Sequence, residues 1–217
     1  MNANKILRFA SIYESLATAE KEELPENSEN TDVILKNLQK LDTYSARKKY
    51  AEKNLKHLSS GSSRIVYLTP NKTVLKLAKN DKGIAQNKVE ANSKMKSKYL
   101  NNVIRKAQNY AWIEVAYLEK ITEKQFKKMT GLDFNDFGES VKFGLKSVSK
   151  HKYRKKPDNF DAISNSDIYK ELVEIGKKFN LMPGDMARIS SWGTKDGRPI
   201  LIDSGLTKEV FEEYYES

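Results

Sequence analysis

The pattern of apolar and polar residues divides the chain near residue 59. Before this point apolar residues recur at helical spacing, which predicts an amphipathic helix over residues 4–19 and one or two helices over residues 32–58. Residues 20–31 are acidic and polar and predict a linker. The first part of the chain is therefore expected to be helical.

A β-hairpin is predicted directly after this helical part. Residues 59–63 are small and polar, which is typical of a turn or a flexible loop. Two stretches rich in apolar residues, Arg64–Leu68 and Thr73–Ala78, flank a turn at residues 70–72. We therefore expect two antiparallel strands preceded by a small-residue loop.

Residues 84–157, in the middle of the chain, predict helices, a strand and an irregular segment. Residues 84–98 predict a helix, and residues 112–118 predict a strand. Thr122 followed three residues later by Gln125 is a capping box, which predicts the start of a short helix. Residues 133–157 are predicted to be irregular and basic.

The clearest helix signal covers residues 164–180. Ile168, Leu172 and Ile175 fall on one helical stripe, and residues 164–166 form a capping cluster at its start. This helix is therefore expected to pack its stripe into a core.

A second hairpin and a terminal helix complete the pattern. Residues 191–194 and 199–202 predict strands, because Asp196 and Gly197 between them are a strong hairpin signal. Residues 207–215 predict the last helix. Helices and antiparallel strands together predict an α+β protein.

Composition narrows the class of protein. The chain has 217 residues, of which 38% are hydrophobic and 31% charged, and 11 Tyr and 8 Phe can still fill a core, so wholesale disorder is excluded. No apolar run approaches the ~18 residues of a membrane span. The chain has no cysteine and two histidines, which excludes disulfides and thiolate zinc sites. We expect a cytoplasmic protein without a membrane contact.

The net charge favours an anionic partner. The formal charge is +10, which favours nucleic acid, nucleotide phosphates or an acidic protein. Residues 142–156 contain seven basic residues and no acidic one. This segment predicts either a polyanion contact or a solvated basic surface.

Lys76 and Glu90 are the first candidate pair. Strand periodicity puts Val74, Lys76 and Ala78 on one face, where an ammonium among apolar residues is costly unless an anion meets it. Glu90 falls on the next predicted helix, which could direct its carboxylate toward Lys76. The alternatives are a lysine at a sheet edge, with its stem along apolar surface, and a solvated glutamate.

Asp185 and Asp203 are the second candidate pair. Asp185 lies in a tight segment after the long predicted helix, and Asp203 ends a predicted strand and is followed by Ser204 and Gly205. A carboxylate at a strand end before a glycine is well placed to hold a metal. The alternative is that both aspartates serve only as turn or cap residues.

Along the chain come a small-residue loop, a lysine on the next hairpin strand, a glutamate on the following helix, a loop aspartate and a D-x-G motif (residues 203–205). This order resembles the protein-kinase-like superfamily. The chain looks most like the small kinase-like proteins encoded by bacteriophages. The resemblance covers about residues 55–207. It implies a minimal two-lobed protein-kinase-like fold with a shortened C-lobe and an N-terminal helical extension. The implied domains are the extension (1–50), a kinase-like N-lobe (51–120) and the C-lobe (121–217).

The resemblance also implies an ATP- and Mg²⁺-dependent phosphotransferase. In the family the lysine pairs with the nucleotide phosphates and with the glutamate, the loop aspartate positions the acceptor hydroxyl, and the D-x-G aspartate holds Mg²⁺. Here these roles fall on Lys76, Glu90, Asp185 and Asp203 respectively. The chain from Tyr117 to Glu119 would offer backbone groups to the purine.

The phosphate loop departs from the kinase pattern. It has one glycine, Gly61, where kinases have several. Backbone N–H groups and the hydroxyls of Ser62 and Ser63 can still cradle phosphate. These three residues are the expected phosphate-binding loop.

The catalytic segment departs from the pattern as well. Gly184 replaces the histidine before the catalytic aspartate, and Ser190 stands near the position of the metal-binding asparagine, so Ser190 is the candidate second metal ligand. Arg188 is the candidate cation that neutralises the transferred phosphoryl group. Fourteen residues follow Asp203, so we do not expect the usual peptide-docking platform. The acceptor is left open and includes a host protein, gripped by residues 142–156 and the N-terminal helices.

Three other functions remain open. One is a catalytically degenerate kinase fold that acts as a binding or inhibitor protein. Another is a basic nucleic-acid-binding protein that uses residues 142–156. The third is nucleotidyl transfer, because a kinase fold can present ATP in either direction.

Overall fold

The computed structural model describes residues 30–148 and 155–216. The predicted helix over residues 4–19 lies outside the described residues. The described chain divides into two compact units, one formed by residues 30–84 and 105–117 and the other by residues 85–104 and 118–216.

A five-stranded sheet and two helices dominate the first unit. The sheet has the order β1-β2-β3-β5-β4, so β3 is its central strand. Pairs β1–β2, β2–β3 and β3–β5 are antiparallel. The elements are α2 (Thr31–Lys40), α3 (Tyr44–Asn54), β1 (Lys56–Ser60), β2 (Arg64–Leu68), β3 (Thr73–Ala78), β4 (Val103–Lys106) and β5 (Trp112–Ala116). The unit boundary falls within β4 and within α4 (Asp81–Glu90).

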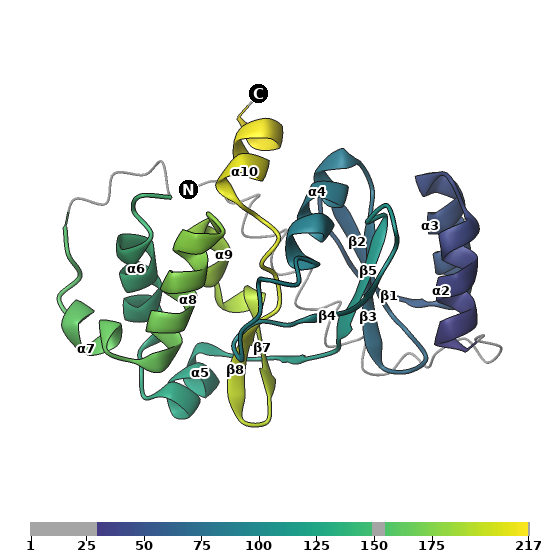
Figure 1. Cartoon of the computed structure of the whole chain (residues 1–217). Coiled ribbons are helices and arrows are strands. Elements are labelled where there is room, and N and C mark those ends of the chain that lie inside the picture. The colour runs from purple at the N-terminus through teal and green to yellow at the C-terminus, as the bar shows by residue number, and fades with distance from the viewer. Residues whose placement is uncertain (1–29, 149–154, 217) are drawn as a thin grey trace, which may run out of the picture. The chain divides into compact units, whose positions relative to one another are not determined.

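Helices α2 and α3 lie side by side against one face of this sheet (Figure 1). Their inner faces and alternate residues of the strands form one apolar core. Its members include Ile34, Leu38, Ala51, Leu75 and Leu77. Because strand residues alternate between faces, Lys76 points to the opposite face from Leu75 and Leu77.

A polar network fixes α2 to the sheet. The carboxylate of Glu114 on β5 is fully buried and accepts hydrogen bonds from Arg105 and from the hydroxyl of Thr73, the latter over 2.6 Å. Arg105 also donates to Asp32 at the start of α2. The hydrogen bond to Glu114 raises the pKa of the Arg105 guanidinium, so the buried carboxylate faces a permanent cation.

The second unit is mainly helical with a small three-stranded sheet, ordered β6-β7-β8. Its elements besides α4 are β6 (Glu119–Lys120), α5 (Glu123–Thr130), α6 (Phe134–Gly144), α7 (Phe160–Ser164), α8 (Asp167–Lys178), α9 (Pro183–Met186), the 3₁₀ turn η1 (Ile189–Ser191), β7 (Trp192–Lys195), β8 (Arg198–Leu201) and α10 (Lys208–Tyr215). Among the described residues, none of the helices is long and apolar enough to span a membrane.

Close helix packing and an aromatic cluster form the core of this unit. Gly176 on α8 approaches Leu145 after α6 so closely that a Cβ there would lie 2.7 Å from the leucine methyl groups. Trp192, which has no exposed surface, meets Phe126, Phe134 and Phe137 at centroid distances of 5.4 to 6.4 Å. The stripe predicted on residues 168–175 is buried in this core.

Several predicted elements are confirmed. Strands β2 and β3 have the predicted bounds. The Thr122 capping box is present, with both reciprocal hydrogen bonds. Asp196 and Gly197 both adopt positive φ in the turn between β7 and β8.

Other predictions were wrong. Residues 59 and 60 belong to strand β1, not to a turn, and β4 was not predicted. The helix expected at 84–98 begins at Asp81 and ends at Glu90. Residues 134–144 of the segment expected to be irregular form α6, because Asp133 caps a helix whose apolar side chains enter the core.

The capping cluster at residues 164–166 was also misassigned. The hydroxyls of Ser164 and Ser166 donate to carbonyl groups of α7, over 3.1 Å and 2.6 Å respectively. Ser166 is the N-cap of α8 by position, but it makes no side-chain cap hydrogen bond. The cluster therefore ends α7, and α8 begins at Asp167.

Candidate active site

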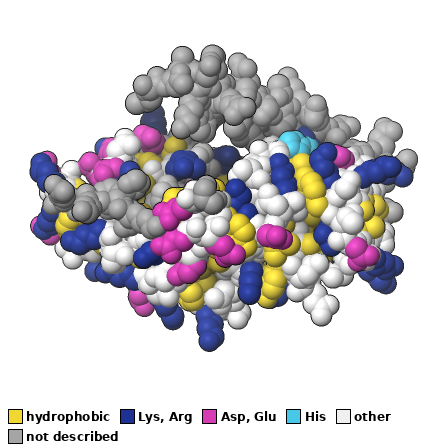
Figure 2. Space-filling model, turned by 90° about the horizontal axis from the view of Figure 1, so that it is seen from above, with side chains coloured by type: hydrophobic (Ala, Val, Ile, Leu, Met, Phe, Trp, Pro, Cys, Tyr) yellow, Lys and Arg dark blue, Asp and Glu magenta, His cyan; other side chains and the backbone are white. Residues whose placement is uncertain are grey.

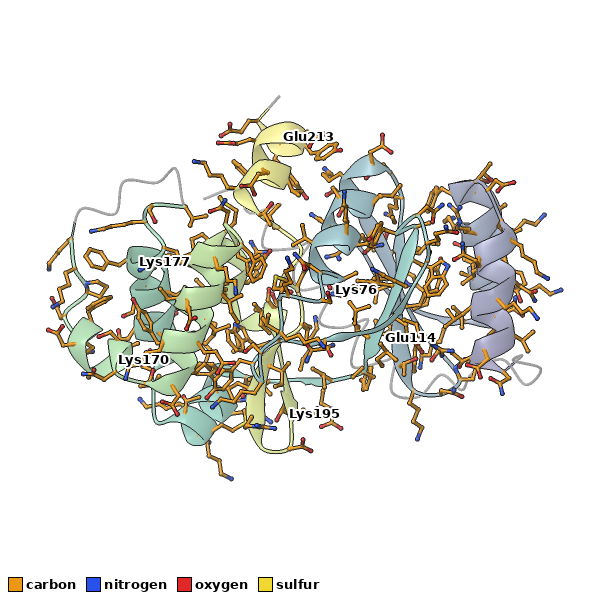
Figure 3. The ribbon with its side chains drawn as sticks, in the orientation of Figure 1. Lys76, Glu114, Lys170, Lys177, Lys195 and Glu213 are labelled. Atoms are coloured by element: carbon orange, nitrogen blue, oxygen red, sulfur yellow. The ribbon has the colours of Figure 1, made fainter. Side chains whose placement is uncertain are left out.

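Lys76 is buried on the central strand of the large sheet. Only 6% of the residue is exposed, and its cross-strand neighbours are Val66 on β2 and Ile113 on β5. Figure 3 shows Lys76 on β3 and Glu114 on the neighbouring strand β5. The alternative of a lysine at a sheet edge is wrong, because β3 is flanked by strands on both sides. A buried ammonium beside two β-branched side chains needs an anionic or polar partner.

The predicted phosphate loop, residues 61–63, is a tight connection between β1 and β2. The N–H of Gly61 donates to the carbonyl of Arg64 over 2.9 Å, which closes a three-residue hairpin loop. Ser63 is buried, with 7% of the residue exposed. The loop therefore has a defined conformation although it has one glycine.

The end of β3 holds this loop. The ammonium of Lys79 donates to the hydroxyl of Ser60 over 2.6 Å and to the carbonyl of Gly61 over 2.7 Å. Its backbone N–H donates to the carbonyl of Ser63 over 2.8 Å. Sequence reasoning missed Lys79, because an isolated lysine after a strand carries no local signal of a contact with a loop eighteen residues earlier.

Glu90, at the end of α4, is buried and lies against the D-x-G segment. The residue is 6% exposed, so the alternative of a solvated helix glutamate is wrong. A Cβ added to Gly205 would lie 2.9 Å from Glu90 Oε1 and 2.9 Å from the carbonyl oxygen of Gln86. Glu90 and Gly205 thus meet within the second unit.

Asp203 follows β8 and is half-buried, and Ser204 and Gly205 after it are buried. The N–H of Ile202 donates to the carbonyl of Ser191 over 2.8 Å, which holds η1, including Ser190, beside the residue preceding Asp203. Strand β8 is also paired with the chain at Tyr99–Asn101, through hydrogen bonds to Leu201. Asp203 is therefore held at the end of a supported strand.

Asp185 lies in α9, and the side chain of this aspartate is 20% exposed. The indole N–H of the buried Trp192 donates to the carbonyl of Met186 over 2.9 Å, which attaches α9 to the aromatic core. The Arg188 guanidinium lies 3.4 Å from a carboxylate oxygen of Asp185. The predicted phosphoryl-facing cation is thus paired with the predicted catalytic carboxylate.

Hydrogen bonds bring the two aspartate-bearing segments together. The N–H of Met182 donates to the carbonyl of Leu206 over 2.9 Å, and the N–H of Lys208 donates to the carbonyl of Asn180 over 2.8 Å. The chain leading to Asp185 and the chain leaving Asp203 therefore run beside one another.

The residues predicted at the purine lie on separate units. Tyr117, 46% exposed, follows β5 in the first unit, and Glu119 lies on β6 in the second, where it pairs with Thr194. The predicted site residues thus form two groups, one around Lys76 and the loop, and one around Glu90, Asp185 and Asp203.

The described ranges 30–148 and 155–216 contain no metal site built from side chains alone. No group of three or more His, Cys, Asp or Glu side chains there could hold a metal alone. Mg²⁺ in phosphoryl-transfer sites takes one or two carboxylates and completes its shell with phosphate and water. Asp203, an oxygen ligand supported by backbone hydrogen bonds, fits this smaller requirement.

Three of the four described basic residues of segment 142–156 have an acidic neighbour. Lys142 pairs with Glu139 at 2.6 Å, Lys156 pairs with Asp161 at 2.7 Å, and Lys155 lies 3.6 Å from Asp158. In Figure 2, Lys and Arg side chains are spread over the face seen, with acidic side chains among them. The other basic residues of the segment, Lys150, Lys152 and Arg154, lie outside the described residues.

Comparison with known proteins gives only remote structural likenesses. The chain matches no family model and no curated protein. Its matches among solved structures include the streptomycin–ATP complex of APH(2″)-IIa (17% identity, 76% of this chain and 71% of that chain, TM-score 0.36) and the ADP-bound aminoglycoside phosphotransferase APH(2″)-Ib (16%, 76% and 71%, TM-score 0.38). The PknI kinase domain of Mycobacterium tuberculosis also matches (13%, 71% and 59%, TM-score 0.33).

TM-scores below 0.5 do not show which fold family the chain belongs to. The structures matched are phosphotransferases and a protein kinase domain by their descriptions, and two of them hold ATP or ADP. They lend no support to the bacteriophage origin or to the host-protein acceptor that the resemblance implied. The function must therefore be argued from the residues of this chain.

Proposed function

We propose that this protein is an ATP- and Mg²⁺-dependent phosphotransferase with a kinase-like arrangement of site residues. The observation that carries the proposal is the burial of Lys76 on a central strand, on the sheet face opposite α2 and α3. A lysine is rarely retained in such a position without an anionic or polar partner. We propose that nucleotide phosphates bind the Lys76 ammonium in addition to its interactions within the chain.

Lys76 binds the nucleotide phosphates in this proposal, and residues 61–63 cover them. Glu90 takes the role of the glutamate on the family's following helix. The support is that Lys76 and Glu90 are both buried, each with 6% exposed surface.

Asp203 is the residue that would hold Mg²⁺, with the hydroxyl of Ser190 as a candidate additional ligand. When bound, the ion would neutralise charge on the phosphate oxygens. The hydrogen bonds of Ile202 with Ser191 and of Leu201 with Tyr99 hold the backbone that leads to Asp203 in the second unit. Gly205 lies so close to Gln86 and Glu90 that a side chain at residue 205 would not fit.

Asp185 orients the acceptor hydroxyl and takes its proton. The bond between the γ-phosphorus and the β–γ bridging oxygen breaks, the acceptor oxygen bonds to phosphorus, and ADP leaves with the bridging oxygen. Arg188, 3.4 Å from Asp185, keeps the carboxylate in place and adds positive charge near the transferred group.

The acceptor in this proposal carries a hydroxyl group. Assays should therefore offer hydroxyl-bearing small molecules, proteins including those of a bacteriophage-infected host, and the protein itself. The test is transfer of labelled γ-phosphate from ATP in the presence of Mg²⁺. Wild type should form a labelled product or release phosphate, and Lys76→Met should lose at least about a hundredfold of that rate, as expected for loss of a preorganised phosphate contact.

A matched control keeps this test specific. Lys36 is an exposed lysine on α2 in the same unit, so Lys36→Met removes the same charge away from the site. Activity that survives in Lys76→Met as fully as in Lys36→Met would refute the proposal.

A second candidate is a kinase-like protein that binds nucleotide without transferring phosphate. The pairing of Asp185 with Arg188 favours it, because an arginine engaged by the catalytic carboxylate competes with the acceptor. Nucleotide binding without any phosphate release, across all acceptors, would favour this candidate over the enzyme.

A further inference from the structure

The connection between β1 and β2 is held by the side chain of Lys79, the residue that follows β3. Lys79 donates from its ammonium to Ser60 Oγ and to the carbonyl of Gly61, at 2.6 and 2.7 Å. An ammonium has three donors and no acceptor, so two of its donors are committed to this loop. We refer to Lys79 with these acceptors as the loop latch.

Further hydrogen bonds of the same corner reinforce the loop latch. The backbone N–H of Lys79 donates to the carbonyl of Ser63 over 2.8 Å, and the side-chain amide of Asn80 donates to the carbonyl of Ser62 over 3.4 Å. Asn80 Oδ1 accepts from the N–H of Gly83 over 3.1 Å. All three loop carbonyls are therefore engaged by the β3–α4 connection.

Gly83 allows this close approach. A Cβ at this position would lie 2.2 Å from the carbonyl oxygen of Ser63 and 3.1 Å from Ala78. No side chain fits there without moving the backbone. The loop, the end of β3 and the first turn of α4 thus form one packed corner in which glycine is required at residue 83.

We propose that Lys79 is a positioning residue for nucleotide binding, which holds residues 61–63 in the conformation that receives the phosphates. This inference rests on the proposed function. A loop with one glycine, fixed through its carbonyls, loses little freedom when a ligand binds, whereas a free loop must be ordered at that moment. The latch stands where kinases have several glycines in this loop.

The test compares ADP and adenosine binding in three single variants. Lys79→Met removes the ammonium and keeps most of the stem, Ser60→Ala removes one acceptor and keeps the charge, and Lys36→Met is the matched surface control. We expect the Kd for ADP to rise by roughly three- to tenfold in Lys79→Met, from the cost of ordering loop side chains. It should rise less in Ser60→Ala and stay unchanged in Lys36→Met.

Adenosine separates positioning from general destabilisation. It has no phosphates, so its Kd should be the same in wild type and in Lys79→Met. An equal loss of adenosine and ADP binding would show a merely structural role and overturn the inference. Unchanged ADP binding in Lys79→Met would overturn it as well.

Hydrogen exchange keeps the latch testable if wild type binds no nucleotide, the result that refutes the proposed function. Exchange of the amides of residues 61–63 should be faster in Lys79→Met than in Lys36→Met, because the latch no longer holds the loop. Equal exchange rates in the two variants would show that Lys79 does not fix the loop, whatever the protein binds.

Discussion

Glu90 lies so close to Gly205 that a single methyl group between them would stand 2.9 Å from the glutamate oxygen. These residues are far apart in sequence, one at the end of α4 and the other in the segment that follows β8. Their contact joins the buried carboxylate of one predicted pair to the D-x-G segment of the other. In the second unit, Glu90 is therefore packed against the D-x-G segment.

This contact predicts the effect of Gly205→Ala. The added Cβ would also lie 2.9 Å from the carbonyl oxygen of Gln86, a backbone atom that cannot move freely. We expect the free energy of unfolding to fall by about 1–3 kcal/mol, the usual cost of overpacking. Chemical denaturation measures it. Gly184→Ala is the control, because a Cβ there meets nothing within 4 Å, and an equal loss in both variants would contradict the packing account.

The buried carboxylate of Glu114 predicts a larger effect. Arg105→Met would leave this fully buried charge without its cationic partner, and loss of one partner of a buried pair costs about 3–5 kcal/mol. Denaturation in urea should show a loss near that size. Arg198→Met provides the comparison, because Arg198 lies 3.8 Å from an exposed Asp196, and such surface pairs contribute about 0–1 kcal/mol. Similar losses in the two variants would show that Glu114 has other support.

Asp185→Asn should separate binding from chemistry. An asparagine keeps the shape of the side chain and cannot take the proton of an acceptor hydroxyl, so the rate of transfer should fall by about 10²–10⁴. Asp185 does not bind the nucleotide in this account, so the Kd for ADP should stay within about twofold of the wild-type value. Loss of a direct contact worth about 1.4 kcal/mol would instead raise this Kd about tenfold. Titration calorimetry and a single-turnover assay measure the two quantities. Undiminished transfer would remove Asp185 from the mechanism.

The ion pairs of the basic segment predict weak nucleic-acid binding. Because Lys142, Lys155 and Lys156 face acidic neighbours, the described residues of this segment leave few cations to release counterions. Fluorescence anisotropy with a labelled oligonucleotide at two salt concentrations should show weak binding, and Asp161→Asn should strengthen it. Tight, steeply salt-dependent binding by wild type would instead favour the nucleic-acid function and draw attention to residues 149–154.

Local signals account for what the sequence could predict. Strands β2 and β3 are short apolar stretches that flank a clear turn, and the β7–β8 turn contains Asp196 and Gly197, two residue types that accept positive φ angles. Strands β1 and β4 lie at the two edges of the sheet, and their pairing defines them. Helix α6 was not predicted, because the basic residues of the segment obscure the helical spacing of Phe134, Phe137 and Val141.

The site residues also divide into those with a local sequence signal and those defined by contacts between distant segments. The burial of Lys76 follows from strand periodicity, which a sequence displays directly. The contacts of Glu90 with Gly205 and of Lys79 with Gly61 join distant segments, and no local pattern encodes them. Sequence order thus identified candidate residues, while their supports became visible only in three dimensions.

The central claim is that Lys76 binds nucleotide phosphates and that Asp203 holds Mg²⁺, and titration calorimetry with ADP, with and without Mg²⁺, tests it most directly. Wild type should bind ADP more tightly with Mg²⁺ than without it. Lys76→Met should weaken binding in both conditions, and Asp203→Asn should abolish the difference that Mg²⁺ makes. Binding by Lys76→Met equal to that of wild type, or an undiminished Mg²⁺ effect in Asp203→Asn, would contradict the account.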